Sequence, residues 1–228
     1  MKKWILIILL IASVDASAVG YAGATIHYEV IDSSADLYKI TYSAFYFCGG
    51  INASLPSLNI NFSSGCPTKN VSGTFVKFNN LPALCLGGNS ACNSPTSTNF
   101  GIREVVYEAF VTLPKTCGNA LIAFQECCLY MNNGPGSFDQ NINQAACINV
   151  YAETQINLSL AGGNNSTKLL NKKFMNCVTG VKNNFNLIGE DADNDSIVYE
   201  TITPLCSYKP IYLRQRKSIC DGRALFDN

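Results

Sequence analysis

Histidine is almost absent from this chain, which has a single one, His27, in 228 residues. Cysteine hydrolases and many zinc sites need histidine, either as the base beside the thiol or as a metal ligand. No two cysteines are separated by two residues, so the Cys-x-x-Cys spacing of zinc sites is missing too. We therefore expect neither a zinc site nor a cysteine nucleophile, and we predict that the protein is not an enzyme.

Charged residues are also scarce, at 14% of the chain, and the formal net charge is zero. A chain of this kind has no long-range field to attract nucleic acid or an acidic membrane surface. We expect no nucleic-acid partner.

Long hydrophobic runs are limited to the start of the chain. Residues 4–12 are apolar, follow Lys2 and Lys3, and precede the small residues 16–18. This is the layout of a secretory signal peptide, which we place at 1–18. The run is too short for a lasting transmembrane anchor, so the sequence predicts a secreted or cell-surface protein without a stable transmembrane anchor.

Cysteine, in contrast, is abundant, with 11 residues after the signal peptide. In an exported chain this abundance predicts disulfides, and the odd number leaves at least one thiol without an intramolecular partner. Adjacent residues on a strand point to opposite faces, so Cys127 and Cys128 should have different partners, while Cys85 and Cys92 are close enough to close a local loop. The residues that we expect in disulfides are Cys48, Cys85, Cys92, Cys117, Cys127, Cys128, Cys147 and Cys177.

Period-two alternation of apolar and polar residues dominates the chain. In residues 37–47, Ile40, Tyr42, Ala44 and Tyr46 fall on one face, which is typical of a half-buried strand. The turn-forming residues 32–36 predict a hairpin with a strand at 25–31. Further strands are expected at 57–62, 74–78, 104–113, 120–130, 148–160, 185–188 and 196–203. Short strands between Gly, Pro, Asn and Ser clusters predict an all-β sandwich or barrel.

Residues 161–166 (AGGNNS) have the composition of a linker. We predict a complete β-sandwich domain at 19–160, this linker, and a partial second domain with a basic tail at 167–228. The partial domain has too few strands to cover both faces of a core, so Ile197, Val198 and Ile202 should lack a covering layer.

Three segments resemble one family, the secreted gliding-motility-associated or PKD-domain surface proteins of Bacteroidetes, which are often exported by the type IX system. The first segment is 42–50 (YSAFYFCGG). The second is 111–114 (VTLP) followed by Cys117 and the vicinal cysteines 127–128, and the third is 191–199 (DADNDSIVY). The chain departs from the family pattern at Phe47, where an Asp is usual, and at 129–131, where the family has Arg-Asn.

The resemblance implies an immunoglobulin-like or PKD-like β-sandwich followed by part of a cadherin-like or immunoglobulin-like domain, as in a truncated member of the family. It implies an adhesin-like or structural role at the cell surface, on the exterior of the outer membrane. The expected partner is an extracellular polysaccharide or protein. It also makes Cys48 a candidate partner for Cys127 or Cys128.

For two sets of candidate site residues, the sequence allows more than one interpretation. Alternating Asp191, Asp193 and Asp195 offer hard oxygen ligands suited to Ca²⁺, against the alternative of a solvated acidic turn. A secreted carbohydrate-active enzyme or its binding module is the alternative function, and a glycosidase would need a carboxylate pair such as Glu104 with Glu126. The aromatic residues around position 45 could form a carbohydrate platform, but core packing explains them better.

Overall fold

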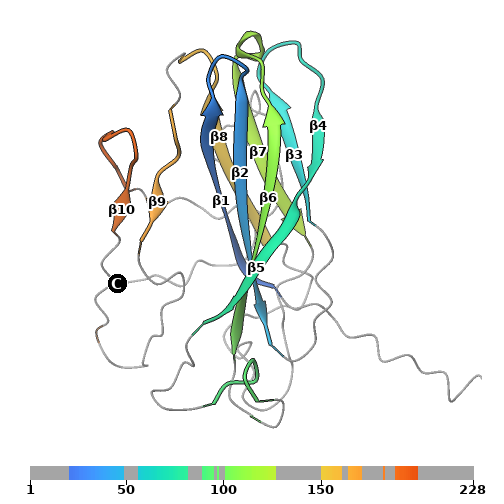
Figure 1. The fold of residues 1–228 in the computed structure, drawn as a ribbon, viewed down its shortest axis with the longest axis vertical. Helices are drawn as coiled ribbons and strands as arrows, with labels where there is room; N and C mark the ends of the chain where they lie inside the picture. The colour runs from blue at the N-terminus through green and yellow to red at the C-terminus, as the bar shows by residue number, and fades with distance from the viewer. Residues whose placement is uncertain are drawn as a thin grey trace, which may run out of the picture.

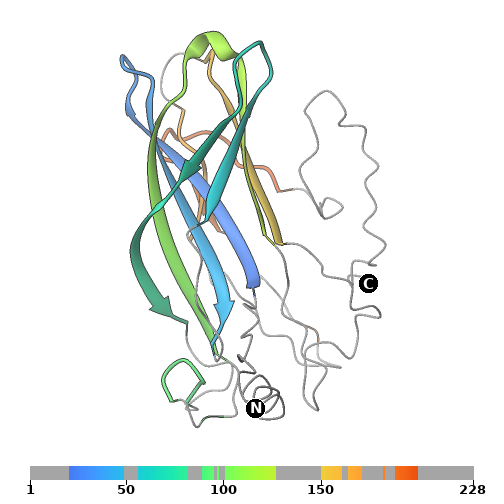
Figure 2. The same ribbon diagram turned by 90° about the vertical axis from the view of Figure 1, so that its right-hand side faces the viewer.

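The computed structural model describes residues 21–48, 56–81, 89–94, 97, 101–126, 150–160, 164–170, 182 and 188–199. Eight strands within these ranges form two four-stranded antiparallel sheets, and two short strands form a third sheet (Figure 1). The two large sheets face each other (Figure 2). The prediction of an all-β sandwich is confirmed. The predicted signal peptide at 1–18 lies outside the described residues.

The predicted hairpin opens the first sheet. Strand β1 (Tyr21–Asp32) pairs antiparallel with β2 (Leu37–Phe47). The Asp32 carboxylate accepts the backbone N–H of Ser34 at 2.8 Å, and Asp36 adopts a positive φ of 52°. Asp suits both positions, because its short polar side chain bonds nearby backbone and tolerates the left-handed region.

The first sheet has the order β1-β2-β6-β5. Strand β6 (Ile102–Thr112) pairs with the whole of β2, so that Phe47 faces Ile102, and β5 (Thr74–Asn80) pairs with the other side of β6. Ser43 and Phe45 are buried although they point away from the sandwich interior, so β2 is covered on both faces near its end.

The second sheet has the order β4-β3-β7-β8. It contains β3 (Ser57–Phe62), β4 (Lys69–Ser72), β7 (Asn119–Glu126) and β8 (Val150–Asn157). Its edge strand β8 lies beside β1 of the first sheet.

At Gly73 the chain passes directly from β4 in the second sheet to β5 in the first. A Cβ atom at this position would lie 2.9 Å from the Cβ of Tyr107. Real Cβ atoms do not approach so closely, so glycine lets the crossing strand pass over β6.

The core lies between the sheets and is rich in aromatic rings. The face of β2 predicted from alternation is buried: Ile40, Tyr42, Ala44 and Tyr46 are all 1% exposed or less. The Tyr42 ring lies 4.5 Å from that of Phe124 on β7. The prediction that these aromatic residues pack in the core is thus confirmed.

The strand order is that of an immunoglobulin-like sandwich. Relabelling β1 to β8 as A, B, C, C′, D, E, F and G gives the sheets ABED and C′CFG. Antibody domains join B to F with an inter-sheet disulfide. Here the contact between Tyr42 and Phe124 links the same two strands.

The C-terminal part differs from the prediction. Its described strands are β9 (Lys168–Leu169) and β10 (Gly189–Glu190). The predicted strand at 196–203 is wrong over its described part, 196–199, which is not strand and leaves Val198 79% exposed. Apolar alternation needs a neighbouring strand to produce a ladder, and no described strand pairs with 196–199.

Candidate functional site

The connections between strands are divided unequally between the two ends of the sandwich. Those at 33–36, 63–68 and 113–118 are short and lie together at the top of Figure 1. Those at 48–56, 81–101 and 127–149 are longer, and all leave from the opposite end. We call this opposite end the long-loop end. Binding residues are often carried on loops held by a rigid scaffold, so it is the candidate functional site.

A disulfide between Cys48 and Cys92 anchors the long-loop end. Cys48 follows β2 and its N–H donates to the carbonyl of Gly101 at 2.8 Å, just before β6. A Cβ at Gly101 would lie 2.6 Å from the Cys92 sulfur, so only glycine fits beside this disulfide. Two of the three long connections are therefore tied to each other and to the sheet.

A second set of contacts at this end links β5, β6 and the connection between these two strands. The Arg103 Nε–H donates to the side-chain oxygen Oδ1 of Asn80 at 2.8 Å, and the side-chain amide of Asn80 donates to Oδ1 of Asn93 at 2.9 Å. The Arg103 guanidinium lies over the Phe78 ring, 4.8 Å from its centroid. These contacts fix the arginine side chain across β5.

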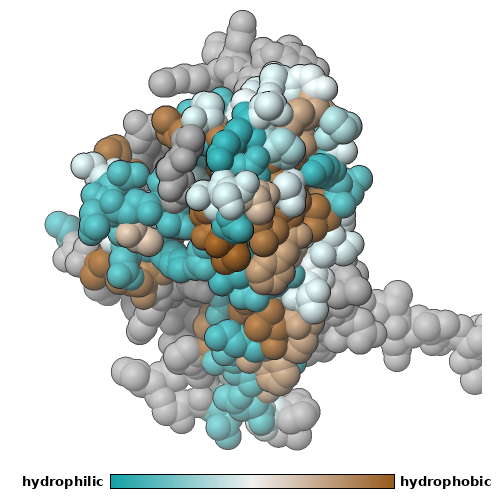
Figure 3. Space-filling view, turned by 45° about the horizontal axis from the view of Figure 1, so that its top comes forward, coloured by the Kyte–Doolittle hydropathy of each residue, from teal (hydrophilic) through white to brown (hydrophobic). Residues whose placement is uncertain are grey.

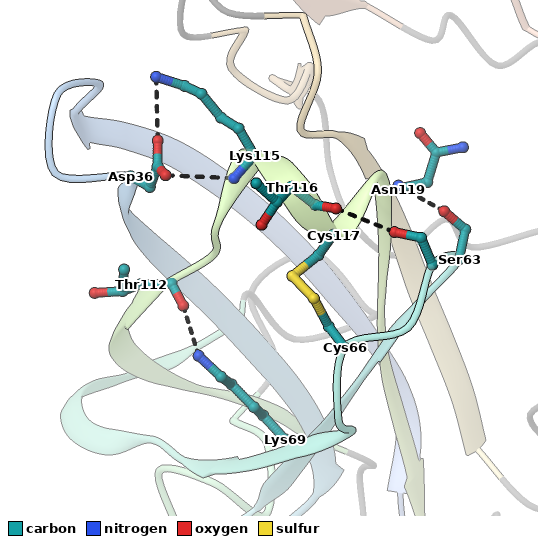
Figure 4. Close-up of a disulfide and its surroundings, with 10 residues drawn as sticks. Asp36, Ser63, Cys66, Lys69, Thr112, Lys115, Thr116, Cys117 and Asn119 are labelled. Atoms are coloured by element: carbon teal, nitrogen blue, oxygen red, sulfur yellow. Dashed lines mark hydrogen bonds and ion pairs between the residues drawn. A yellow bond between two sulfur atoms is a disulfide. The ribbon is translucent and has the colours of Figure 1, made fainter.

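The opposite end is closed by a second disulfide, Cys66–Cys117, which joins the connection 63–68 to the short 3-10 helix η1 (Lys115–Cys117) (Figure 4). Hydrogen bonds and an ion pair reinforce it. Lys69 Nζ donates to the Thr112 carbonyl at 2.8 Å, and Lys115 Nζ lies 3.1 Å from an Asp36 carboxylate oxygen. This end is a rigid base.

Residues 164–168 dock on the outer edge of β1, and we call them the strap. Ser166 Oγ accepts the Tyr28 N–H at 2.8 Å, and the Ser166 N–H donates to the Tyr28 carbonyl at 3.0 Å. The side chain of Asn165 accepts the Val30 N–H at 2.8 Å. The strap thus satisfies backbone groups that an edge strand would otherwise expose. Asn165 and Ser166 belong to the predicted linker, whose role as a domain boundary stays a prediction.

An ion network holds the strap from the outer face of the sheet. Glu29 on β1 pairs with Lys168 and with Lys39 on β2, the latter at 2.7 Å. Hydrogen bonds from Lys168 and then Lys39 lower the pKa of Glu29 from 4.5 to about 2. The carboxylate therefore stays charged through most of the acid range.

Two of the three acidic residues named as calcium ligands, Asp191 and Asp193, hold the strap as well. Asp193 accepts hydrogen bonds from the backbone and side chain of Asn165 at 2.6 and 3.0 Å. Asp191 accepts the backbone N–H of Asp193 and of Asp195, and the Thr167 hydroxyl. Within the described residues, no group of three or more Asp, Glu, His or Cys side chains could hold a metal ion. What the structure shows here is an acidic turn bound to the strap.

The disulfides confirm some expected cysteines and correct their pairing. Cys48, Cys92 and Cys117 do form disulfides. The expected local pair of Cys85 with Cys92, and the pairing of Cys48 with Cys127 or Cys128, are wrong, because Cys48 bonds Cys92. The physical reason is the ladder between β2 and β6, which brings the segment before β6 beside the end of β2.

Cys66, the partner of Cys117, was not among the cysteines that we expected in disulfides. The expected cysteines outside the described residues are Cys85, Cys127, Cys128, Cys147 and Cys177.

The residues considered for catalysis are not brought together. Glu104 is on the outer face of the first sheet and is buried, with a hydrogen bond from the Asn79 amide at 3.1 Å. Glu126 ends β7 on the side of the strand that faces the core. His27 is half-buried on β1, opposite Thr41.

Arg103 and Phe78 were not identified from the sequence. A cation and an aromatic residue on separate strands show no spacing signal, and only the pairing of β5 with β6 brings them together.

No protein-family model, no curated protein and no solved structure matches the chain. Within the described residues, no helix is long and apolar enough to cross a membrane. The two disulfides are typical of proteins that mature in an oxidising compartment outside the cytosol.

Proposed function

We propose that this protein is a secreted or cell-surface binding module with an adhesive or structural role, of the gliding-motility-associated type. Its ligand is an extracellular polysaccharide or protein, bound at the long-loop end. One observation carries the proposal: the three long connections leave a rigid sandwich at the same end, and the Cys48–Cys92 disulfide ties two of them together.

The contrast between the two ends supports this proposal. The end stapled by Cys66–Cys117 has short connections that the disulfide, Lys69 and Lys115 hold in place. A rigid base opposite long connections is the arrangement by which immunoglobulin-type sandwiches present their binding loops. Such loops bind well when their positions are fixed before the ligand arrives, because less conformational entropy is lost on binding.

The polar residues at this end suit a polar ligand. Asn93 and Arg103 carry amide and guanidinium N–H groups, which can donate hydrogen bonds to hydroxyl or carboxylate oxygens, and Asn80 holds both side chains in place. The proposal does not depend on calcium, because Asp191 and Asp193 contact the strap and not the long-loop end. The alternative of a carbohydrate-active enzyme gains no support from Glu104 and Glu126, which face different sides of the sandwich.

The test is a glycan array combined with a hydrolysis screen on the same polysaccharides. We expect binding without turnover. The double variant Cys48→Ser/Cys92→Ser should lose most of the binding, because it unties the long-loop end. The double variant Cys66→Ser/Cys117→Ser is the matched control, since it removes one disulfide from the opposite end and should retain binding at a temperature where it is folded. Turnover of any polysaccharide, or equal binding loss in both variants, would overturn the proposal.

A further inference from the structure

Strand β5 forms an open edge of the first sheet. All its residues, Thr74–Asn80, are exposed, and Phe78 is 56% exposed. Among the described residues, β5 pairs only with β6, and the strand makes no other backbone hydrogen bond. Strand β5 crosses the front of the sandwich in Figure 1, and a band of apolar side chains runs down the molecule in Figure 3. The backbone groups on the outer side of β5 are therefore available to another strand.

The other edge of this sheet, strand β1, is covered by the chain itself. There the strap covers β1, with Ser166 and Asn165 bonded to backbone groups of Tyr28 and Val30. Among the residues that the structure describes, the strap thus closes one edge of the sheet and no segment pairs with the outer side of β5. An edge left open, with exposed Phe75, Val76 and Phe78, is suited to recognition by strand addition.

The register limits where a strand could add. A bulge between Phe75 and Lys77 interrupts the ladder with β6, but pairing is regular from Lys77 to Asn80. Antiparallel pairing of two copies centred on β5 would place Lys77 opposite its own copy, which is unfavourable for like charges. The strand has no acidic residue to offset this charge. A second copy is therefore a poor occupant, and a segment with carboxylates is a good one.

Arg103 provides the matching charge. Its Nε–H is bonded to Asn80 and its guanidinium is stacked on Phe78, so the group lies across β5 beside the regular part of the edge. Its terminal N–H groups make no hydrogen bond to the described residues. A guanidinium fixed in this way can bind a carboxylate through two parallel hydrogen bonds. The acidic Glu104 is on the opposite face of the sheet, bonded to Asn79.

We propose that the β5 edge from Lys77 to Asn80 binds an extended, acidic peptide segment of a partner protein by strand addition, and that Arg103 pairs with one of its carboxylates. Backbone hydrogen bonds to β5 supply affinity. Arg103 on one face and Lys77 on the other select acidic side chains. This surface adjoins the long-loop end, where Arg103 also lies, and the inference goes beyond the proposed function.

The test uses a blocked peptide about ten residues long, which is within the usual length of a strand. Pairs of glutamate alternate with pairs of threonine in it, so that carboxylates lie on both faces of the added strand. Binding is measured by isothermal titration, and its position by backbone amide chemical shifts. We expect binding that shifts the amide signals of residues 77–80. The peptide with lysine in place of glutamate should not bind, and neither should the glutamate peptide with every backbone nitrogen methylated, because full methylation removes the donors for the ladder from both edges of the peptide.

Two variants test the charges. Arg103→Gln should weaken binding about tenfold or more, as expected for the loss of a charge-assisted pair. Lys77→Glu changes an exposed side chain and should also weaken binding, which keeps the test valid if Arg103→Gln fails to fold. Lys69→Gln, at the other end of the sandwich, is the matched control and should bind as wild type does.

Equal binding of the lysine peptide, or unchanged affinity in both variants, would overturn the proposal. Dimer formation by the protein alone, detected by light scattering and accompanied by shifts of the amide signals of residues 77–80, would favour a second copy instead and would overturn the proposal. Loss of glycan binding in Cys48→Ser/Cys92→Ser is scored independently, so failure of the proposed function is distinguishable from failure of this inference.

Discussion

Removing the strap's side-chain caps should loosen β1 without unfolding the sandwich. The perturbation is the double substitution Asn165→Ala/Ser166→Ala. It leaves the N–H groups of Tyr28 and Val30 without their acceptors, which now lie at 2.8 Å in each case. The backbone bond from the Ser166 N–H to the Tyr28 carbonyl remains possible.

The size of the effect follows from the cost of an unsatisfied donor. A hydrogen bond contributes about 1 kcal/mol net, and leaving a partly buried donor unpaired costs about 1–3 kcal/mol. Both donors lie at a sheet edge where water can partly replace the acceptor. We therefore expect the free energy of local opening to fall by about 1.4 kcal/mol at each amide. Because 1.4 kcal/mol is tenfold in an equilibrium constant, the exchange rate of each amide hydrogen should rise about tenfold.

Native-state hydrogen exchange by NMR measures this directly, because it reports local opening residue by residue. The control is Ser159→Ala, whose hydroxyl donates only to the nearby Asn157 side chain at 2.6 Å. If the Tyr28 and Val30 amides exchange no faster in the double variant than in the control, the strap does not protect β1 and the reasoning is refuted.

Three further predictions concern stability in urea. The hydrogen bond from Lys168 is the main cause that lowers the pKa of Glu29 from 4.5 to about 2. The contribution of Glu29 to the free energy of unfolding is therefore complete above pH 4.5 and is lost as the pH falls toward 2. Glu29→Gln should therefore cost about 0.5–1 kcal/mol at neutral pH and nothing near pH 2; an equal cost at both pH values would contradict this. Gly73→Ala should cost about 1–3 kcal/mol, because the added methyl group would overlap a side chain of β6, and wild-type stability would show that the crossing can relax. Loss of Cys66–Cys117, with 51 residues of separation, should cost about 3–4 kcal/mol, checked against the wild-type midpoint; a change under about 1 kcal/mol would show that this end is held by other contacts.

Much of the fold could be predicted from local sequence. Alternation in β2 identified the face on which Ile40, Tyr42 and Tyr46 are buried, because side chains on a strand alternate strictly between faces. Turn residues between β1 and β2 predicted their hairpin for the same local reason. Residues 196–199 carry similar apolar residues yet form no strand, since a ladder needs a neighbour as well as a pattern.

The candidate site was less predictable. The sequence determined that the chain would be a disulfide-bonded β-sandwich, because composition and period-two alternation act over a few residues. Only the tertiary structure decided that Cys92 would meet Cys48, that Asn165 and Ser166 would cap β1, and that Arg103 would lie across Phe78. These contacts join residues far apart in the chain or on different strands, and they depend on strand order and register. Neither order nor register is encoded in the spacing of any single segment.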